Sequence, residues 1–279
     1  MIWGSDLRPL DFWTSGPGKN GQAPRLCSGQ AVKKSSGLAV ILFLLLFQSS
    51  FAFSFAVFGD NHNDVNTLST IFSKIKADKN IAFAVNLGDF VNNGSAADYK
   101  QYVDFIDKSG IKVYNVMGNH DAAHGGYKLF AKYFGKDYYS FDHENAHFLV
   151  LNNSFKVFFD KTQMDFLLKD LKANQGKPIF VFFHKPTFDP SEVYTNYLAS
   201  DRKTAEKMME IFKRYKVRYV MTGHIHAYLR AERDGVIYIV TGGAGGPLHL
   251  PASLGGYYHY VKVTVDGDQI KDEVVRLYE

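Results

Sequence analysis

The segment that organises the chain is residues 53–89, FSFAVFGDNHNDVNTLSTIFSKIKADKNIAFAVNLGD. Its two apolar runs, Phe53–Gly59 and Ile81–Asn86, have the length and composition of buried strands. A strand, a helix and a strand in this order predict a parallel β-α-β unit, because parallel strands need a crossover connection. The helix is expected over Asp64–Ala77, where apolar side chains recur on one face: Val65, Leu68, Ile71, Phe72 and Ile75.

The same alternation continues through the body of the chain. A helix is expected over Ala96–Lys108 and a third strand over Ile111–Val116, followed by a hairpin of Tyr138–Phe141 and His147–Leu151. A parallel half followed by antiparallel strands predicts an α/β fold (α+β in some schemes) of two packed mixed sheets with helices outside. The remaining elements are helices over Lys161–Ala173 and Arg202–Tyr215, and strands over Pro178–Phe183, Val217–Met221, Tyr228–Glu232, Val236–Val240, Tyr257–Val265 and Gln269–Val275.

The segment before this body has the pattern of a targeting sequence. Leu38–Phe47 is an uncharged apolar run that follows Lys33 and Lys34, and small residues flank Phe51 at its end. A basic region, a short apolar region and a small-x-small exit predict a secretory signal peptide over residues 32–52. The protein is therefore expected to be exported, periplasmic or secreted, with a mature domain over residues 53–279. The alternative is an uncleaved membrane anchor, because Leu38–Phe58 is about as long as a membrane span.

Residues 1–31 resemble neither a targeting sequence nor a domain. They are rich in Gly, Pro and Ser, a composition that favours disorder, and the biological start is expected near Val32. The sequence thus predicts a disordered or wrongly assigned extension, a signal peptide and one domain.

Charge and cysteine content exclude several kinds of site. Residues 53–279 hold 27 basic and 26 acidic side chains, because five of the 32 basic and two of the 28 acidic ones lie in residues 1–52. This balance gives no reason to expect nucleic-acid binding. The only cysteine is Cys27, so the body has no thiolate ligand. Any metal ion in it must be held by His, Asp, Glu or Asn.

Metal-competent side chains follow the carboxyl ends of five expected strands, where open α/β sheets form their sites. Because i and i+2 project to the same side of extended backbone, Asp60 with His62, and His224 with His226, can each point two ligands into one cavity. A carboxylate such as Asp89 can bridge two cations. The five segments are Asp60-Asn61-His62, Gly88-Asp89, Gly118-Asn119-His120-Asp121, His184 and Gly223-His224-Ile225-His226.

In their order, these segments resemble the motifs of the calcineurin-like metallophosphoesterases: D-x-H, G-D, G-N-H-D, H and G-H-x-H. Each motif alone is weak, but the ordered set is specific. It covers the chain from about Phe53 nearly to the C-terminus. The resemblance implies an αββα four-layer sandwich, in which two mixed sheets are flanked by helices.

The resemblance also implies a role for each matching residue. Two divalent or trivalent ions (Mn, Fe or Zn) would be bound, with Asp89 and a hydroxide bridging them, and the hydroxide would attack a phosphate ester. His120 would be the general acid, with Asp121 orienting its imidazole. The first ion would be held by Asp60, His62, Asp89 and His226, and the second by Asp89, Asn119, His184 and His224.

Departures from related groups narrow the expected substrate. Asn92-Asn93 stand where the protein Ser/Thr phosphatases would have Asp-Arg, so a phosphate-binding arginine is missing. Purple acid phosphatases would have a tyrosine ligand at Asn92 and would lack His62. A small phosphate mono- or diester is therefore the expected partner, with Asn93 a candidate contact to its phosphate. A membrane would be a partner only through an uncleaved N-terminal segment.

Other features have simpler interpretations. Lys185 is expected to face solvent, and His249 to be an ordinary surface or core residue. The glycine-rich loop Thr241–Pro247 is expected to form a pocket wall, either with backbone N–H groups offered to an anion or as a plain connection. The competing function is a phosphate-ligand binding or scaffolding protein that kept the fold and lost turnover. The complete ligand set with His120 favours an enzyme.

Overall fold

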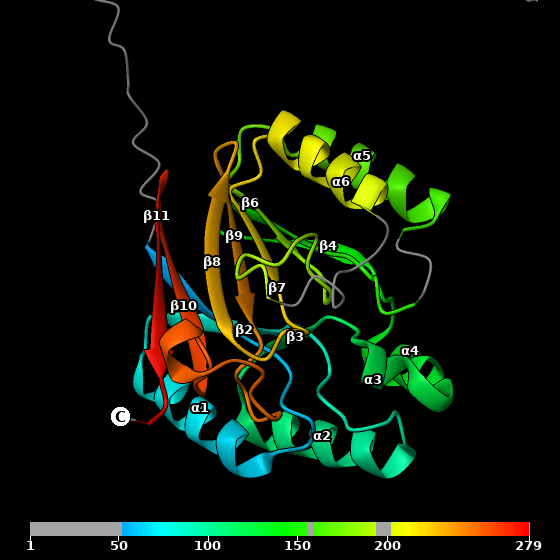
Figure 1. Cartoon of the computed structure of the whole chain (residues 1–279), viewed down its shortest axis with the longest axis vertical. Coiled ribbons are helices and arrows are strands. Elements are labelled where there is room, and N and C mark those ends of the chain that lie inside the picture. Colours follow the sequence, from blue (N-terminus) through cyan, green and yellow to red (C-terminus); the bar gives the residue numbers. More distant parts are fainter. Residues whose placement is uncertain (1–51, 156–158, 194–201, 279) are drawn as a thin grey trace, which may run out of the picture. The chain divides into compact units, whose positions relative to one another are not determined.

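Two β-sheets form the centre of the computed structural model, which describes residues 52–155, 159–193 and 202–278 (Figure 1). The first sheet has the order β11-β10-β1-β2-β3: Gln269–Arg276, His259–Asp266, Phe53–Phe58, Ile81–Asn86 and Val113–Asn115. The second has the order β4-β5-β6-β7-β9-β8: Tyr139–His143, Ala146–Val150, Ile179–Phe182, Tyr219–Thr222, Val236–Thr241 and Tyr228–Arg233. Both sheets are mixed, with parallel pairs β1–β2–β3 and β5–β6–β7–β9.

Helices cover the outer faces of both sheets. Helices α1 (Val65–Ala77) and α2 (Ala96–Ser109) pack on the first sheet, and α5 (Lys161–Ala173) and α6 (Arg202–Arg214) on the second (Figure 1). This arrangement confirms the expected αββα sandwich. The short helical segments α3 (Asn119–Ala122), η1 (Ala123–Gly125), α4 (Tyr127–Phe134) and η3 (Ala252–Leu254) lie in the connections.

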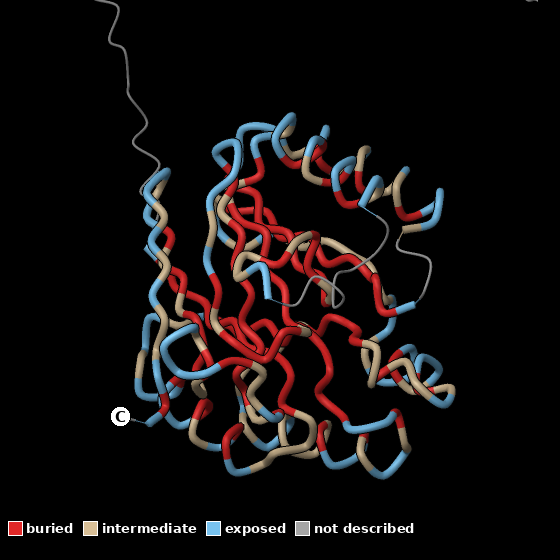
Figure 2. Tube along the Cα trace, viewed as in Figure 1, coloured by how far each residue is buried: buried red, intermediate tan, exposed pale blue. Residues whose placement is uncertain are grey.

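Strand β1 shows why the sequence folds into layers. All six of its residues are buried. Phe55 and Val57 belong to the core between the sheets, whereas Ala56 and Phe58 belong to the core under α1 and α2. A strand covered on both faces must be apolar throughout, which explains the continuous run in the sequence. The buried segments accordingly concentrate in the strands (Figure 2).

Aromatic rings fill the space between the sheets. Phe55 stacks on Phe83 of the first sheet, with centroids 5.3 Å apart, and Phe148 stacks on Phe180 of the second, at 5.1 Å. Phe55 meets Phe148 edge to face at 5.3 Å, which joins the two layers. Ring contacts of this geometry add about 0.5–1.5 kcal/mol each beyond the area that they bury.

The C-terminal hairpin completes the first sheet. Strand β10 pairs antiparallel with β1, and β11 with β10, so the last strands of the chain lie beside the first. The sequence predicted these strands but did not assign them to a sheet. Helices α3 and α4 were not predicted, because the 119–134 segment carries the site motif and glycines in place of a long amphipathic repeat.

The expected signal peptide and the extension before it fall on residues 1–51, which are outside the described residues. Within residues 52–155, 159–193 and 202–278, no helix combines the length and the apolar content that crossing a bilayer requires.

A buried histidine in the second sheet is expected to make stability depend on pH. The Nδ1 atom of His147 lies 2.7 Å from Asp142, and its Nε2 atom 2.6 Å from Asp170. Burial disfavours the imidazolium, but the two carboxylates hold the pKa of His147 above its usual value. The stabilisation is therefore fully present below about pH 6.5, the unfolded value, and is lost as pH rises through the raised folded pKa.

Replacing His147 with glutamine should consequently lower the free energy of unfolding by about 1–3 kcal/mol more at pH 6 than at pH 9. Chemical denaturation with excess chelator, which removes the contribution of bound metal, measures the difference. Asp170→Asn should likewise destabilise the protein more at pH 6 than at pH 9. A loss of equal size at both pH values would contradict it.

Candidate metal centre

The carboxyl ends of five strands bring the expected ligands together. Asp60 and His62 follow β1, Asp89 follows β2, and Asn119 lies beyond the end of β3. From the second sheet, His184 follows β6, and His224 and His226 follow β7. Among the described residues, three groups of side chains have the composition and spacing to hold a metal ion, with ligand atoms within 4.8 Å of one another: Asp60, His62 and His226; His62, Asp89 and His120; and Asp89, His184 and His224.

Left-handed backbone, not extended backbone, presents these side chains. The φ angles are 63° at Asp60, 43° at His62, 51° at Asp89 and 68° at His224. L-residues enter this region at a cost of order 1 kcal/mol or more, and such residues cluster at functional sites. The alternation argument for the two i, i+2 pairs is thus wrong in its physical reason. His224 and His226 belong to different groups, which agrees with the division that the resemblance implied.

Two glycines let the segments approach closely. A Cβ atom on Gly118 would lie 2.1 Å from Asp89 Oδ1 and 2.2 Å from the Asp89 nitrogen. Gly88 has φ +98°, and a Cβ there would lie 2.6 Å from the Gly118 nitrogen. All three distances are far below any normal contact, so the turn that carries Asp89 fits against Gly118 only if neither glycine carries a side chain. The glycines of the two motifs therefore have a steric role in placing Asp89.

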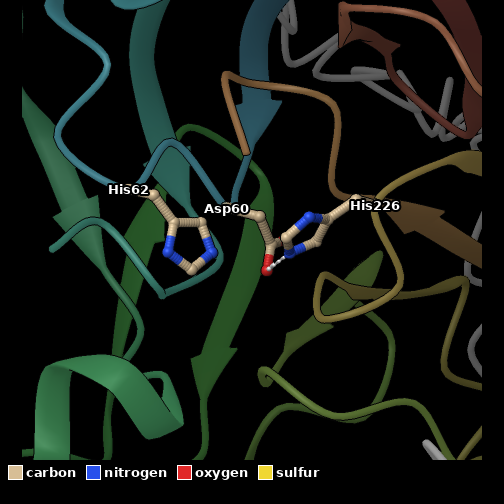
Figure 3. A group of neighbouring side chains, drawn as sticks. All are labelled: Asp60, His62 and His226. Atoms are coloured by element: carbon tan, nitrogen blue, oxygen red, sulfur yellow. Dashed lines mark ion pairs between the residues drawn. The ribbon is translucent and has the colours of Figure 1, made fainter. Parts of the chain in front are cut away.

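The first group, Asp60, His62 and His226, is shown in Figure 3. Nε2 of His226 lies 3.4 Å from an Asp60 oxygen, while its Nδ1 lies 2.7 Å from the Pro247 carbonyl. A ring that donates from Nδ1 to a carbonyl keeps the lone pair of Nε2 for a cation. Nε2 of His62 is buried and has no hydrogen-bond partner among the described residues. A cation bound here would supply the missing partner.

In the second group, Asp89, His184 and His224, a histidine is again held by a backbone carbonyl at Nδ1. Nε2 of His184 lies 3.1 Å from an Asp89 oxygen, 3.1 Å from Asn119 Oδ1 and 3.2 Å from His224 Nδ1. Its Nδ1 is 2.9 Å from the Leu87 carbonyl, which again leaves Nε2 for a cation. Four nitrogen and oxygen atoms thus meet around one point, as in mixed N/O metal sites without sulfur.

The three groups are linked to one another through Asp60 and Asp89. The backbone N–H of His224 donates to both carboxylate oxygens of Asp60, at 3.0 Å each. The backbone N–H of His120 donates to Asp89 Oδ1 at 2.8 Å. Because Asp89 takes part in two of the three groups, it occupies the position that a shared ligand requires.

The buried histidines His184 and His224 differ in pKa because their charged neighbours differ. Burial disfavours the charge on His184, but Asp89 and Asp60 raise its pKa to about 9. Burial and the neighbouring His184 lower the pKa of His224 to about 3. Only the neutral ring of His184 can bind a cation, so metal binding must release its proton.

A buried amide network holds the loops that carry the first two carboxylates. The Asn86 amide donates to Asn61 Oδ1 and to the Tyr102 hydroxyl, at 3.0 Å each, and Tyr102 donates to Asn115 at 2.6 Å. Asn61 donates to the Phe90 carbonyl at 3.1 Å. These polar residues in buried positions were not singled out in the sequence. The sequence feature that could have indicated them is an asparagine at the end of each of two apolar strands, Asn86 and Asn115.

Asp121 does not have the expected contact with the His120 ring. Its two oxygens accept from the backbone N–H groups of Asp89, Gly118 and Val91 at 2.7–3.1 Å. The His120 Nδ1 lies 2.5 Å from the Asn92 carbonyl instead. The orienting role assigned to Asp121 is thus corrected: its carboxylate fixes the backbone around Asp89, and the Asn92 carbonyl orients His120.

Residues around the rim depart from the simpler expectations. His249 stacks on His226, with centroids 4.0 Å apart, and its Nδ1 lies 3.2 Å from the His226 backbone nitrogen. Lys185 is partly buried, and its Nζ donates to the Ser154 carbonyl at 3.3 Å, so the expectation that it faces solvent is wrong. The proposed substrate contact Asn93 is exposed beside Asn92.

The glycine-rich loop after β9 is part of the site wall. A Cβ on Gly246 would lie 2.7 Å from the His226 ring and 2.8 Å from the His62 ring. The N–H groups of Gly242, Ala244 and Gly246 donate to the carbonyls of Ala227, Gly59 and Asp60. These three amides are therefore used within the protein and not offered to an anion.

Comparison with known proteins places this geometry in a family context. Residues 53–228 match the model of the calcineurin-like phosphoesterases. A 3′,5′-cyclic-nucleotide phosphodiesterase of Nostoc sp. is 26% identical over 157 residues, which are 54% of this chain and 58% of that protein. The serine/threonine-protein phosphatase CPPED1 of Danio rerio is 28% identical over 207 residues, which are 66% of this chain and 64% of that protein.

Among solved structures, the purple acid phosphatase from yellow lupin (Lupinus luteus) seeds superimposes with a TM-score of 0.69 and 18% identity. The alignment covers 82% of this chain and 52% of the lupin chain, and at 18% identity it supports the fold alone. The chain also spans less than two thirds of each of the two curated relatives.

Proposed function

Because the chain belongs to the calcineurin-like phosphoesterase family, we propose that it hydrolyses phosphate mono- or diesters with a pair of metal ions. The observation that carries this proposal is the convergence of three ligand groups that are joined through His62 and Asp89, each of which belongs to two of them. The orphaned Nε2 of His62 and the inward-turned Nε2 atoms of His184 and His226 fit cations. The proposed ligands are Asp60, His62, Asp89, Asn119, His184, His224 and His226.

The residues of the chain would divide the work of hydrolysis. Bound ions would supply Lewis acidity and lower the pKa of a water molecule, for which N/O ligation suits Mn, Fe or Zn. His120 is partly exposed and lies in the group of His62 and Asp89, so its ring can protonate a departing oxygen there, while the Asn92 carbonyl at 2.5 Å holds its orientation. Asp121 keeps the Asp89 turn in place through three backbone hydrogen bonds. Asn93 is the proposed polar contact of the substrate at the rim.

The test is reconstitution of chelator-stripped full-length protein with Mn²⁺, Fe²⁺ or Zn²⁺, followed by assay on 4-nitrophenyl phosphate and bis(4-nitrophenyl) phosphate. We expect two ions per chain, no turnover of either ester by stripped protein, and restored turnover of at least one. Both esters are needed because the matched relatives are named as a phosphodiesterase and a phosphatase. Metal-saturated protein that turns over neither ester would instead support the phosphate-binding or scaffolding alternative.

A further inference from the structure

Exposed large apolar side chains occur in several of the connections that follow strand ends. Two of them lie in connections that leave the carboxyl ends of strands, Tyr127 after β3 and Phe155 after β5. This is the edge at which the candidate metal centre lies. Tyr133, which is also exposed, lies instead with Ile111, Lys112 and Val113 near the amino end of β3.

Two of these side chains form a pair of rings. The centroids of Tyr127 and Phe155 are 6.0 Å apart, with an interplanar angle of 70°. Tyr127 is 43% exposed and Phe155 is 44% exposed, so much of each ring remains in contact with water. Two adjacent aromatic rings that the fold leaves uncovered can bury a third ring at little conformational cost.

The pair is attached to the segments that carry the proposed acid and one ligand. Gly126, before Tyr127, packs so tightly that a Cβ there would lie 2.1 Å from the Asp121 carbonyl and 2.8 Å from Gly94. On the other side, the carbonyl of Ser154, before Phe155, accepts from Lys185 at 3.3 Å.

Hydrogen bonds also connect the segment before Phe155 to the proposed ligand His184. Asn153 Oδ1 accepts from the backbone N–H groups of His184 and Lys185, at 3.1 and 3.0 Å, and its amide donates to the Lys185 carbonyl at 2.8 Å. Phe155 is therefore tied to the His184 strand end, and Tyr127 to the segment that carries His120.

We propose that Tyr127 and Phe155 form the subsite for the organic group of the ester, and that this group contains a flat aromatic ring, such as a nucleobase. The inference rests on the proposed function and adds the substrate class to it. Charge on the rim agrees, because Lys128 Nζ lies 5.8 Å from the Tyr127 ring centroid and Lys185 Nζ lies 3.3 Å from the carbonyl of Ser154, the residue before Phe155. Cations next to a stacking surface suit an anionic ester that carries a ring.

The experiment compares esters with and without an aromatic ring, all of which have alkoxide leaving groups. The monoester pair is adenosine 5′-monophosphate and glycerol 3-phosphate, and the diester pair is 3′,5′-cyclic AMP and glycerophosphoethanolamine. Phe155→Ala and Tyr127→Ala should each raise KM for the ring-containing ester between about 5- and 150-fold, which is the range for loss of one base-stacking contact. The KM of the aliphatic ester and both kcat values should change less than about two-fold.

Matched variants separate stacking from a general disturbance. Tyr133→Ala alters another exposed tyrosine of α4, whose ring stacks on Tyr99 and not on Phe155, and it should leave both KM values unchanged. Phe155→Trp should retain the preference for the ring-containing ester. Equal changes on both esters, or no change on either, would overturn the subsite and favour a surface for another partner. Wild-type turnover of the aliphatic ester would leave the proposed function standing in that case, whereas absent turnover of all four esters would overturn both.

Discussion

Replacing Asp89 with asparagine should reduce bound metal from two ions per chain to one or none and remove nearly all turnover. Asp89 is the carboxylate common to two of the three ligand groups, and it lies 3.1 Å from the buried His184. The change removes one negative charge between two cations, where water cannot compensate. We expect kcat to fall by a factor on the order of 10³ or more, because losing a single preorganised transition-state contact already costs about 10²–10³.

Asparagine is the informative replacement because it is close to aspartate in shape and keeps an acceptor for the His120 N–H. The fold should survive, which thermal unfolding of chelator-treated protein would verify. Inductively coupled plasma mass spectrometry measures the ions per chain. Asp107→Asn removes one carboxylate from the exposed side of α2 and serves as the control for charge. If the Asp89→Asn protein kept two ions and wild-type turnover, a shared ligand at this position would be excluded.

Replacing His120 with asparagine should slow the hydrolysis of an alkyl phosphate by about 10²–10⁴-fold, the usual contribution of a general acid. A 4-nitrophenyl ester should be affected much less, because nitrophenolate departs without a proton. The dependence of rate on the leaving group is therefore the signature of the role, and it separates proton donation from a general loss of structure. Metal content should remain at the wild-type value.

The structure also offers a different role for His120, that of a metal ligand. His120 belongs to one ligand group, with His62 and Asp89, and its ring lies 4.6 Å from that of His62. If His120→Asn lost an ion, and both esters slowed equally, His120 would be a ligand and not an acid. His124→Asn, a change to an exposed histidine in the next short helix, should alter neither property.

Much of this fold could be predicted because strong local signals agreed with the topology. Continuous apolar runs such as Phe53–Phe58 identify strands that are covered on both faces, and the carboxyl-end rule then brings Asp60, Asp89 and His184 to one edge. The sheet that receives β10 could not be predicted, since antiparallel pairing with β1 depends on contacts between the two ends of the domain.

The parts of the site that the sequence did not predict depend on contacts between loops that are far apart in the chain. His249 stacks on His226 across 23 residues of chain, and nothing in the local sequence distinguishes it from a surface histidine. Asp121 follows His120 directly, which suggested a contact between their side chains. The short helix α3 turns the Asp121 carboxylate toward backbone amides instead.

At the proposed ligands with left-handed backbone, stability and metal binding favour different residues. Glycine at Asp60, His62, Asp89 or His224 would relieve a conformational cost of order 1 kcal/mol at each position. The same exchange would delete a donor that the cations need. Directed evolution for heat resistance, carried out without assaying turnover, would therefore tend to erase the centre one residue at a time.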